Sequence, residues 1–331
     1  MIDSNSMSQP VQMIYSASEK NMTQMPTKRR KLLRRSPSED IPPVRLTERD
    51  LAIIDAVYTY RALTTNQIQQ LLFPVTDGGS VRGRLVHCQH RLKLLYHNGY
   101  LTRDERPTKL SEGRQALIYF LDKLGAQAIA AYRHVAAEDL DWRPRDNTAG
   151  ASHLFLDHLL HTNDVRIAFN LAAAVDGWEI VRWLDDRTLR RREMKEYVTL
   201  PETGERVAIV PDGFFSLARG RDIYHYFIEA DLATVVGLSS KSGRRDWARK
   251  VRAYLAYYQS GQYAKRYKAQ SFRVLTVTTG TGRLENLRHI TEEIGGRSIF
   301  WFTTYEALSE QSNIAAPIWS VANREGQSAL I

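Results

Sequence analysis

Apolar residues at the start of the ordered pattern recur three and four positions apart, which is the spacing of amphipathic helices. A first helix is predicted to begin at Thr47, because Thr47 and Asp50 form a capping-box pattern. A second helix is predicted to begin at Thr64-Thr65 and to end before the segment FPVTDGG, whose proline and glycines break helices.

A third helix is predicted over residues 80–97, where one apolar stripe faces inward and the remaining faces carry basic side chains but no acidic one. The stripe consists of Val81, Leu85, Cys88, Leu92 and Leu95. Two extended runs, 100–106 and 116–122, flank a polar loop with a glycine and read as a hairpin. Two helices, a basic helix and a hairpin follow the order of a winged helix-turn-helix. A further helix is expected from residue 124 to about 135.

In the second half of the chain, segments with the three-to-four-residue spacing of helices alternate with segments typical of strands. Helices are expected over residues 153–174, 244–259 and 284–294, and strands over 178–184, 207–217, 223–233, 272–279 and 298–302. The order is α-β-β-β-α-β with an appended α-β pair. We therefore predict an α/β (α+β) protein that combines a winged helix with a second, sheet-based domain.

The domain boundaries follow from composition. Residues 1–44 lack periodicity and are interpreted as a disordered basic arm, and residues 143–152 as a linker. The winged helix-turn-helix domain is placed at 45–142, the second domain at 153–310 and a tail at 311–331.

The chain has 331 residues, a formal net charge of +9 and a pI of about 9.6, which favours an anionic partner. One cysteine, Cys88, excludes an internal disulfide and indicates a buried structural thiol in a reducing compartment. No apolar run is long enough to span a membrane and the N-terminus lacks a signal-peptide pattern. We therefore expect a cytoplasmic, nucleoid-associated protein without a membrane partner.

Positive charge is concentrated in three segments, 28–35, 80–115 and 241–273, and dense local charge is what phosphate binding requires. The predicted partner is double-stranded DNA, with the basic helix in the major groove and the hairpin on phosphates or in the minor groove. The candidate DNA-binding residues are Arg82, Arg84, Gln89, Arg91, Lys93, Arg103, Arg106, Lys109, Arg114, Arg244, Arg245 and Arg249. A solvated basic helix that contacts no DNA is the alternative.

Three acids interrupt otherwise apolar strands in the second half: Asp212, Glu229 and Asp231. Burying carboxylates is costly without a partner or a metal. A two-residue turn at Gly220-Arg221 would pair Asp212 with Glu229, and the strand period of two places Asp231 on the same face. Three clustered carboxylates predict a site for Mg²⁺ or Mn²⁺, an ion that can activate water for phosphodiester cleavage. A salt-bridged set without metal is the alternative.

A sequence motif in this region resembles the pattern of the PD-(D/E)XK nuclease-like fold, whose core element order also matches. The motif consists of Pro211-Asp212, a spacer of sixteen residues and then Glu229-Ala230-Asp231. The resemblance implies metal-ligand roles for Asp212 and Glu229.

The sequence departs from this pattern at Asp231, which stands where the catalytic lysine belongs. Some members of that superfamily carry the lysine on the following helix, and Lys250 is the candidate. It lies one turn from Trp247 and Tyr254, so it is expected to flank the apolar face and point toward the sheet. Lys241 is the second candidate. The resemblance thus implies a catalytic set of Asp212, Glu229, Asp231 and Lys250 if the domain is active.

The winged helix combined with PDGFF, FIEADLAT and the Lys250-to-Tyr254 spacing resembles the replication–relaxation family of plasmids and mobile elements. The resemblance implies a DNA-binding protein that acts in replication, relaxation or transfer and whose nuclease-like domain either nicks DNA or only grips it. A Mg²⁺-dependent nickase and a dimeric transcriptional regulator are the alternatives, and an adaptor for replication or transfer proteins is a third. A homodimer on a palindromic site is one expected form. His158 is interpreted as an ordinary helix residue, with His161 or Asp164 as candidates for a first-helix contribution to the metal site.

Overall fold

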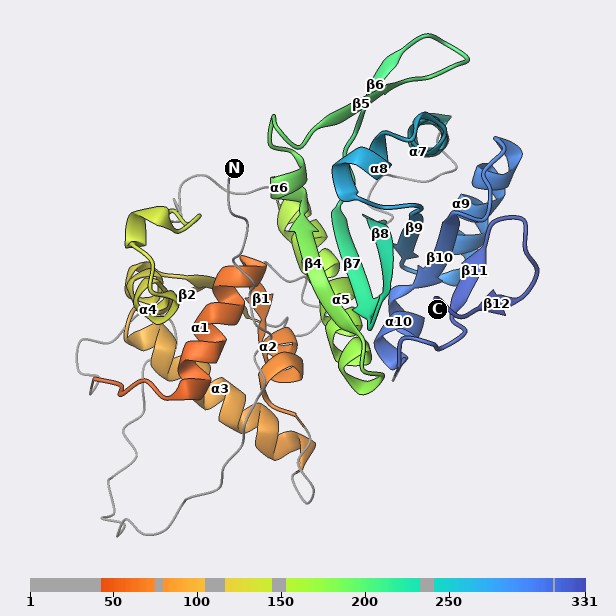
Figure 1. Cartoon of the computed structure of the whole chain (residues 1–331). Coiled ribbons are helices and arrows are strands. Elements are labelled where there is room, and N and C mark those ends of the chain that lie inside the picture. Colours follow the sequence, from red (N-terminus) through yellow and green to blue (C-terminus); the bar gives the residue numbers. More distant parts are fainter. Residues whose placement is uncertain (1–42, 75–79, 105–116, 145–152, 233–240, 312) are drawn as a thin grey trace.

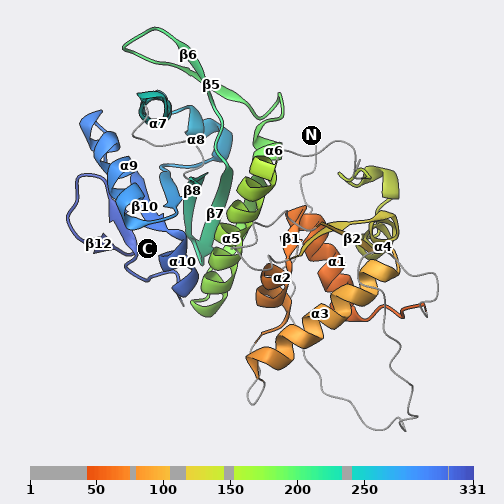
Figure 2. The ribbon, with the colours of Figure 1, turned by 180° about the vertical axis from the view of Figure 1, so that it is seen from behind.

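The computed structural model describes residues 43–331 except 75–79, 105–116, 145–152, 233–240 and 312. Two bodies of structure lie side by side, and helix α5 lies between them (Figures 1 and 2). Residues 1–42 of the predicted basic arm fall outside the described residues, as does most of the predicted linker. No helix among the described residues is long and apolar enough to cross a bilayer.

The first body has the element order predicted for a winged helix. Its elements are α1 (Glu48–Tyr60), β1 (Leu63–Thr64), α2 (Thr65–Leu72), α3 (Val81–His97), β2 (Leu101–Asp104), β3 (Ile118–Leu121), α4 (Lys123–Arg133) and a 3₁₀ turn at Ala137–Asp139. The described strands form one antiparallel sheet in the order β1-β3-β2. The capping box at Thr47 and Asp50 is confirmed, and Thr64 with Gln67 forms another at the start of α2.

The core of this body confirms the predicted inner stripe of α3 at three of its five positions, while Leu85 is half-buried and the side chain of Val81 lies outside the described residues. Cys88, Leu92 and Leu95 are fully buried and pack against Ile53 and Ile54 of α1. Burial raises the pKa of the Cys88 thiol to about 12, so this side chain is an inert part of the core.

The second body is a three-layer α/β/α arrangement. Its principal elements are α5 (His153–Val175), β4 (Glu179–Asp185), β7 (Gly213–Arg219), β8 (Asp222–Ala230), α7 (Lys241–Ser260), α8 (Gln262–Tyr267), β9 (Arg273–Thr278), α9 (Thr281–Glu293), β10 (Phe300–Thr304) and α10 (Tyr305–Glu310). Apolar residues of α5 pack on one face of the sheet, and those of α7 and α9 pack on the other. The predicted order α-β-β-β-α-β is confirmed by α5, β4, β7, β8, α7 and β9.

Two short strands complete the main sheet, β11 (Trp319–Val321) and β12 (Gln327–Ser328). Among the described residues the strand order is β12-β11-β10-β9-β8-β7-β4, with β8, β9 and β10 parallel. The interpretation of residues 311–331 as a tail is therefore wrong. Trp319 and Val321 are buried in the core, but a three-residue strand is too short to show a period in the sequence.

The prediction of a single strand over 207–217 is also wrong, because this segment divides into two strands, β6 (Arg206–Ile209) and β7. Pro211 lies at the break and has no N–H to donate to a ladder. Strand β6 instead pairs with β5 (Glu196–Thr199) in a separate hairpin. Together with α6 (Asp186–Leu189), this hairpin forms an insertion between β4 and β7 that extends from the sheet (Figure 1).

The predicted turn between β7 and β8 is confirmed. Gly220 has a φ of 62°, a conformation that glycine adopts without strain. The register pairs Gly213 with Ile228, so Asp212 lies next to Glu229, as the counting predicted.

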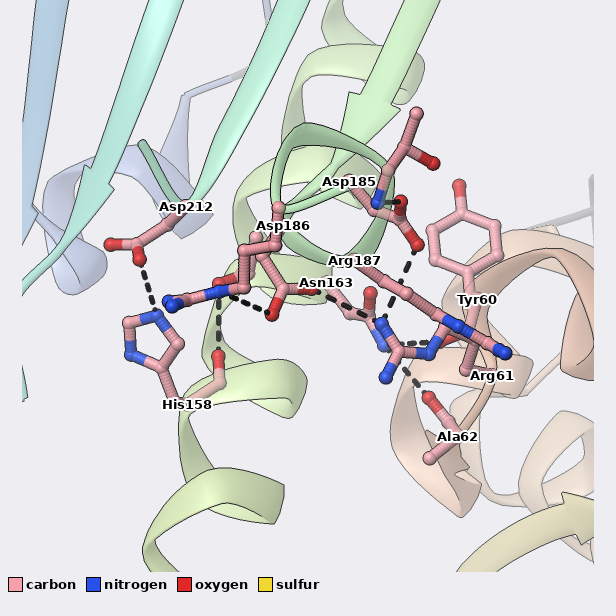
Figure 3. Close-up of polar contacts among 12 residues, drawn as sticks. Tyr60, Arg61, Ala62, His158, Asn163, Asp185, Asp186, Arg187 and Asp212 are labelled. Atoms are coloured by element: carbon pink, nitrogen blue, oxygen red, sulfur yellow. Dashed lines mark hydrogen bonds and ion pairs between the residues drawn. The ribbon is translucent and has the colours of Figure 1, made fainter. Parts of the chain in front are cut away.

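Helix α5 joins the two bodies through buried hydrogen bonds. The side-chain amide of Asn163 donates to the carbonyls of Tyr60 and Ala62 at 3.1 and 2.8 Å (Figure 3). Gln67 of α2 donates to the carbonyl of Leu160 at 2.8 Å. These contacts satisfy backbone carbonyls that are shielded from water.

The ion pair between Asp50 and Arg91 provides a test of the first body. Asp50 is fully buried, caps α1 and accepts from Arg91 Nε at 2.7 Å. Asp50→Ala should lower the free energy of unfolding by about 3 kcal/mol, because it removes a cap and leaves Arg91 without its partner. Asp55→Ala is the matched control on the same helix, since Asp55 pairs with Arg133 at the surface, and should cost less than about 1 kcal/mol. Equal losses in denaturant unfolding would contradict this interpretation.

Candidate functional site

Two carboxylates meet at the end of the sheet where β7 begins and β8 ends. Asp212 is 7% exposed and Glu229 is 2% exposed. Asp212 is anchored to the neighbouring strand, since its Oδ2 accepts from the N–H of Ala230 at 2.9 Å. The sheet therefore brings together two of the three predicted acids.

Helix α7 supplies two donors to Glu229. Lys250 Nζ lies 2.5 Å from Oε2, and the Tyr254 hydroxyl donates to Oε1 at 2.5 Å. The two residues are four apart and so lie on one helix face. Lys250 thus points toward the sheet as predicted, although its catalytic role stays a prediction. The side chain of the second candidate, Lys241, lies outside the described residues.

A histidine that the sequence interpretation missed completes the cluster. His158 of α5 places Nε2 2.8 Å from Asp212 Oδ1 (Figure 3). The candidates from this helix lie elsewhere: His161 Nδ1 contacts the carbonyl of Asp157, and Asp164 accepts from Gln67. Helical spacing did not distinguish among these positions, because nothing local shows which turn of α5 crosses the sheet end.

Asp231 does not join the other two acids, which corrects the expectation of a three-carboxylate cluster. Its carboxylate forms a bidentate ion pair with Arg283 of α9 at 2.7 and 2.8 Å and accepts from the Thr278 hydroxyl at 2.6 Å. Strand β8 ends at Ala230, so the strand period no longer fixes the direction of the next side chain.

The donor set does not fit a resident Mg²⁺ or Mn²⁺ in this arrangement. Each oxygen of Asp212 and Glu229 already has a protein donor, namely His158, the Ala230 N–H, Lys250 or Tyr254. In the part of the chain that the structure describes, no three His, Cys, Asp or Glu side chains are placed to hold a metal ion. A metal ion at this position would compete with His158 and Lys250 for the carboxylate oxygens.

Burial and neighbouring charges shift the pKa values of the residues in this cluster. Burial raises the pKa of Glu229 from 4.5 to about 7, which outweighs the lowering effect of Lys250. The hydrogen bond to Asp212 raises the pKa of His158 above its ordinary value, although burial lowers it. Burial lowers the pKa of Lys250, but the carboxylates of Glu229 and Asp212 outweigh that effect and the net shift is upward.

A cavity of about 460 Å³ opens onto this cluster. Strand β6 forms one wall, and Lys250, Ala253 and Tyr254 of α7 form the other, with Glu229 between them. The insertion therefore borders the acid site directly.

The second candidate site is the exposed face of α3. Arg82, Val86, Gln89 and Lys93 are spaced by four, three and four residues and so share one face. Arg82 and Gln89 are exposed, Lys93 is half-buried and Val86 is 56% exposed. The helix contains no acid.

Two candidates on α3 serve the fold instead, which corrects their assignment to DNA. Arg91 is held in the ion pair with buried Asp50, and Arg84 donates to the carbonyl of Phe73 at 3.0 Å. Both side chains point toward α1 or α2, a direction that composition does not reveal.

The remaining basic candidates divide into three groups. Arg103 lies over the Tyr96 ring at 4.1 Å. Arg249 pairs with Glu205 at the surface, so it is not available as a bare charge. The other candidates lie outside the described residues or have undescribed side chains: Arg106, Lys109, Arg114, Arg244 and Arg245.

The raised pKa of Glu229 predicts a pH-dependent stability. As pH rises above 4.5, the unfolded state loses the Glu229 proton first, so folding becomes less favourable until about pH 7. The free energy of unfolding of the wild type, relative to Glu229→Gln, should fall by roughly 3 kcal/mol between pH 4.5 and 8.

Urea unfolding across this range measures the difference. Glu205→Gln is the control, because the hydrogen bond from Arg249 lowers the pKa of exposed Glu205 and its effect has the opposite sign. If the free energy of unfolding of the wild type relative to Glu229→Gln stays constant or rises with pH, the raised pKa of Glu229 is contradicted.

Comparison with known proteins places this arrangement in a family. Two solved structures of the restriction endonuclease FokI, one bound to DNA, match at 11% and 12% identity with TM-scores of 0.24 and 0.26. Each match covers 79% of this chain but only 43% of the FokI chain, and TM-scores this low do not establish a shared fold. No curated protein matches the sequence. The family model described as replication-relaxation matches residues 54–271, about two thirds of the chain, and the protein therefore belongs to the replication-relaxation family.

Proposed function

We propose that the protein binds double-stranded DNA with α3 in the major groove and acts in the replication, relaxation or transfer of a plasmid or mobile element. The observation that carries the proposal is the exposed face of α3, which presents Arg82, Gln89 and Lys93 on a winged-helix scaffold. Membership of the replication-relaxation family supports the wider role.

The chemistry of this face suits base-edge contacts. Arginine pairs with guanine O6 and N7, and glutamine pairs with adenine N6 and N7. Between them, Val86 offers an exposed apolar side chain for a thymine methyl. The opposite face of α3 is fixed by Arg91 and the buried stripe, so the exposed face is presented rigidly.

The hairpin is assigned a positioning role. Arg103 lies on β2 against Tyr96, beyond the end of the exposed face of α3, where phosphate contacts would set the register of the protein on the duplex.

Substitution of the α3 face tests the proposal. Arg82→Ala/Gln89→Ala should weaken binding to a selected duplex by about 30-fold or more, because each base contact is worth roughly 1–3 kcal/mol. Lys123→Ala/Gln127→Ala is the matched control, since it likewise removes one positive charge and one side-chain amide, here from exposed positions of α4. Fluorescence anisotropy gives the affinities, and equal affinity of the two variants would overturn the role of α3.

Metal-dependent DNA cleavage is the second candidate function. It is favoured by one observation: Asp212, Glu229 and Lys250, the residue types of the PD-(D/E)XK pattern, converge from three separate elements. It is opposed by the protein donor that each oxygen of Asp212 and Glu229 already has and by the ion pair that holds Asp231.

Incubation of supercoiled plasmid with Mg²⁺ or Mn²⁺ decides between the two candidates. We expect the wild type and Glu229→Ala to retard the plasmid equally and to leave it supercoiled, because the donors of the cluster occupy the carboxylates. Nicked circles from the wild type that disappear in Glu229→Ala and in Asp212→Ala would instead establish a nuclease.

A further inference from the structure

A dense basic surface lies on the insertion between β4 and β7, apart from every residue assigned above to DNA. Five exposed side chains define this α6 surface: Arg187, Arg190, Arg191, Arg192 and Lys195. Residues 185–196 also contain four acids, but Asp185 and Asp186 pair with Arg61 and Glu196 pairs with Arg266, all outside this surface, which leaves Glu193 as the one exposed acid among the five bases. The surface therefore carries a marked excess of positive charge.

The α6 surface is only partly neutralised by its neighbours. Arg187 and Arg191 share one acid, Asp141, at 2.8 and 2.9 Å. Arg190 lies 3.7 Å from Asp186 and stays 54% exposed. Within the described part of the chain, no ion pair is formed by Arg192 or Lys195, so these charges face solvent.

The insertion holds this surface beside the acid site. Asp185, the last residue of β4, pairs with Gly213, which directly follows Asp212. Asp185 also caps α6 by accepting from the Thr188 N–H at 2.9 Å. The first turn of α6 thus begins next to β7, the strand that directly follows Asp212.

Two further contacts fix the position of α6. Leu189 is 2% exposed and belongs to the core under α7. Arg61, at the end of α1, contacts Asp185 and Asp186 at 3.5 and 3.1 Å (Figure 3). The basic side chains are therefore displayed from a fixed base, and little ordering of the backbone would accompany binding.

We propose that the α6 surface binds the phosphate backbone of duplex DNA and places it beside the Asp212–Glu229 site. The proposal rests on the proposed function, since it assumes that the chain binds DNA. Four of the five side chains are arginines, whose planar guanidinium groups pair with phosphate oxygens in a bidentate manner. Contacts of this kind position a duplex and do not read its sequence.

The α6 surface and α3 form separate contacts. Both views show α6 in the upper half of the molecule, below the β5–β6 hairpin, and α3 in the lower half (Figures 1 and 2). Removal of one surface leaves the other in place, so their contributions to binding can be measured independently.

The salt dependence of binding tests the proposal. Each neutralised phosphate contributes about 0.9 to the slope of log affinity against log salt concentration. Arg190→Ala/Arg192→Ala/Lys195→Ala should lower the slope by about 2 to 3 on a duplex of ~40 base pairs, while the order of preference among DNA sequences is unchanged. The control is Arg221→Ala/Arg297→Ala/Arg324→Ala, which removes three exposed charges from other parts of the surface and should leave the slope near the wild-type value.

The outcomes separate this proposal from the function on which it rests. A lower slope for the α6 variant alone, with an unchanged melting temperature, supports the proposal. Equal slopes for the α6 and control variants overturn it, even if Arg82→Ala/Gln89→Ala still weakens binding. If the wild type binds no duplex at all, both the proposal and the proposed function fail.

Discussion

The arrangement of this protein depends on the need to satisfy polar groups that α5 buries. Near its middle, Asn163 is buried and donates to the carbonyls of Tyr60 and Ala62 at the end of α1. One and a half turns earlier, the imidazole of His158 contacts the carboxylate of Asp212 at the sheet end. A single helix therefore sets both the orientation of the first body and one side of the acid site, and a shift of α5 would break hydrogen bonds in both bodies.

The same requirement shapes the acid site. Two carboxylates that are almost inaccessible to solvent would be unfavourable without partners, and here the partners come from α5, α7 and the adjacent strand. The result is a hydrogen-bonded cluster in which Lys250 and Tyr254 occupy the oxygens of Glu229. The residue types match those of a nuclease, but their contacts make a closed network, and the pKa of about 7 for Glu229 reflects burial more than charge.

Much of this architecture could be predicted because it depends on local rules. Capping residues located α1 and α2, and the glycine of the turn at Gly220 fixed the register that brings Asp212 to Glu229. The parts that could not be predicted depend on contacts distant in sequence. Arg91 meets Asp50, Asp231 meets Arg283 and His158 meets Asp212 only after the helices have packed. A charge pattern identifies a basic helix, but it does not identify which of its arginines face the core.

The neutralisation of the acid site is compatible with the proposed DNA contact at the α6 surface, although two buried acids lie beside it. Isolated carboxylates at the sheet end would repel a phosphate backbone. Lys250 balances Glu229, His158 with its raised pKa faces Asp212, and Arg283 balances Asp231. Because these charges cancel at short range, the field beyond the site is set by the exposed arginines of the α6 surface. The contacts that hold the two buried carboxylates therefore also remove the repulsion that the proposed DNA contact at the α6 surface would otherwise meet.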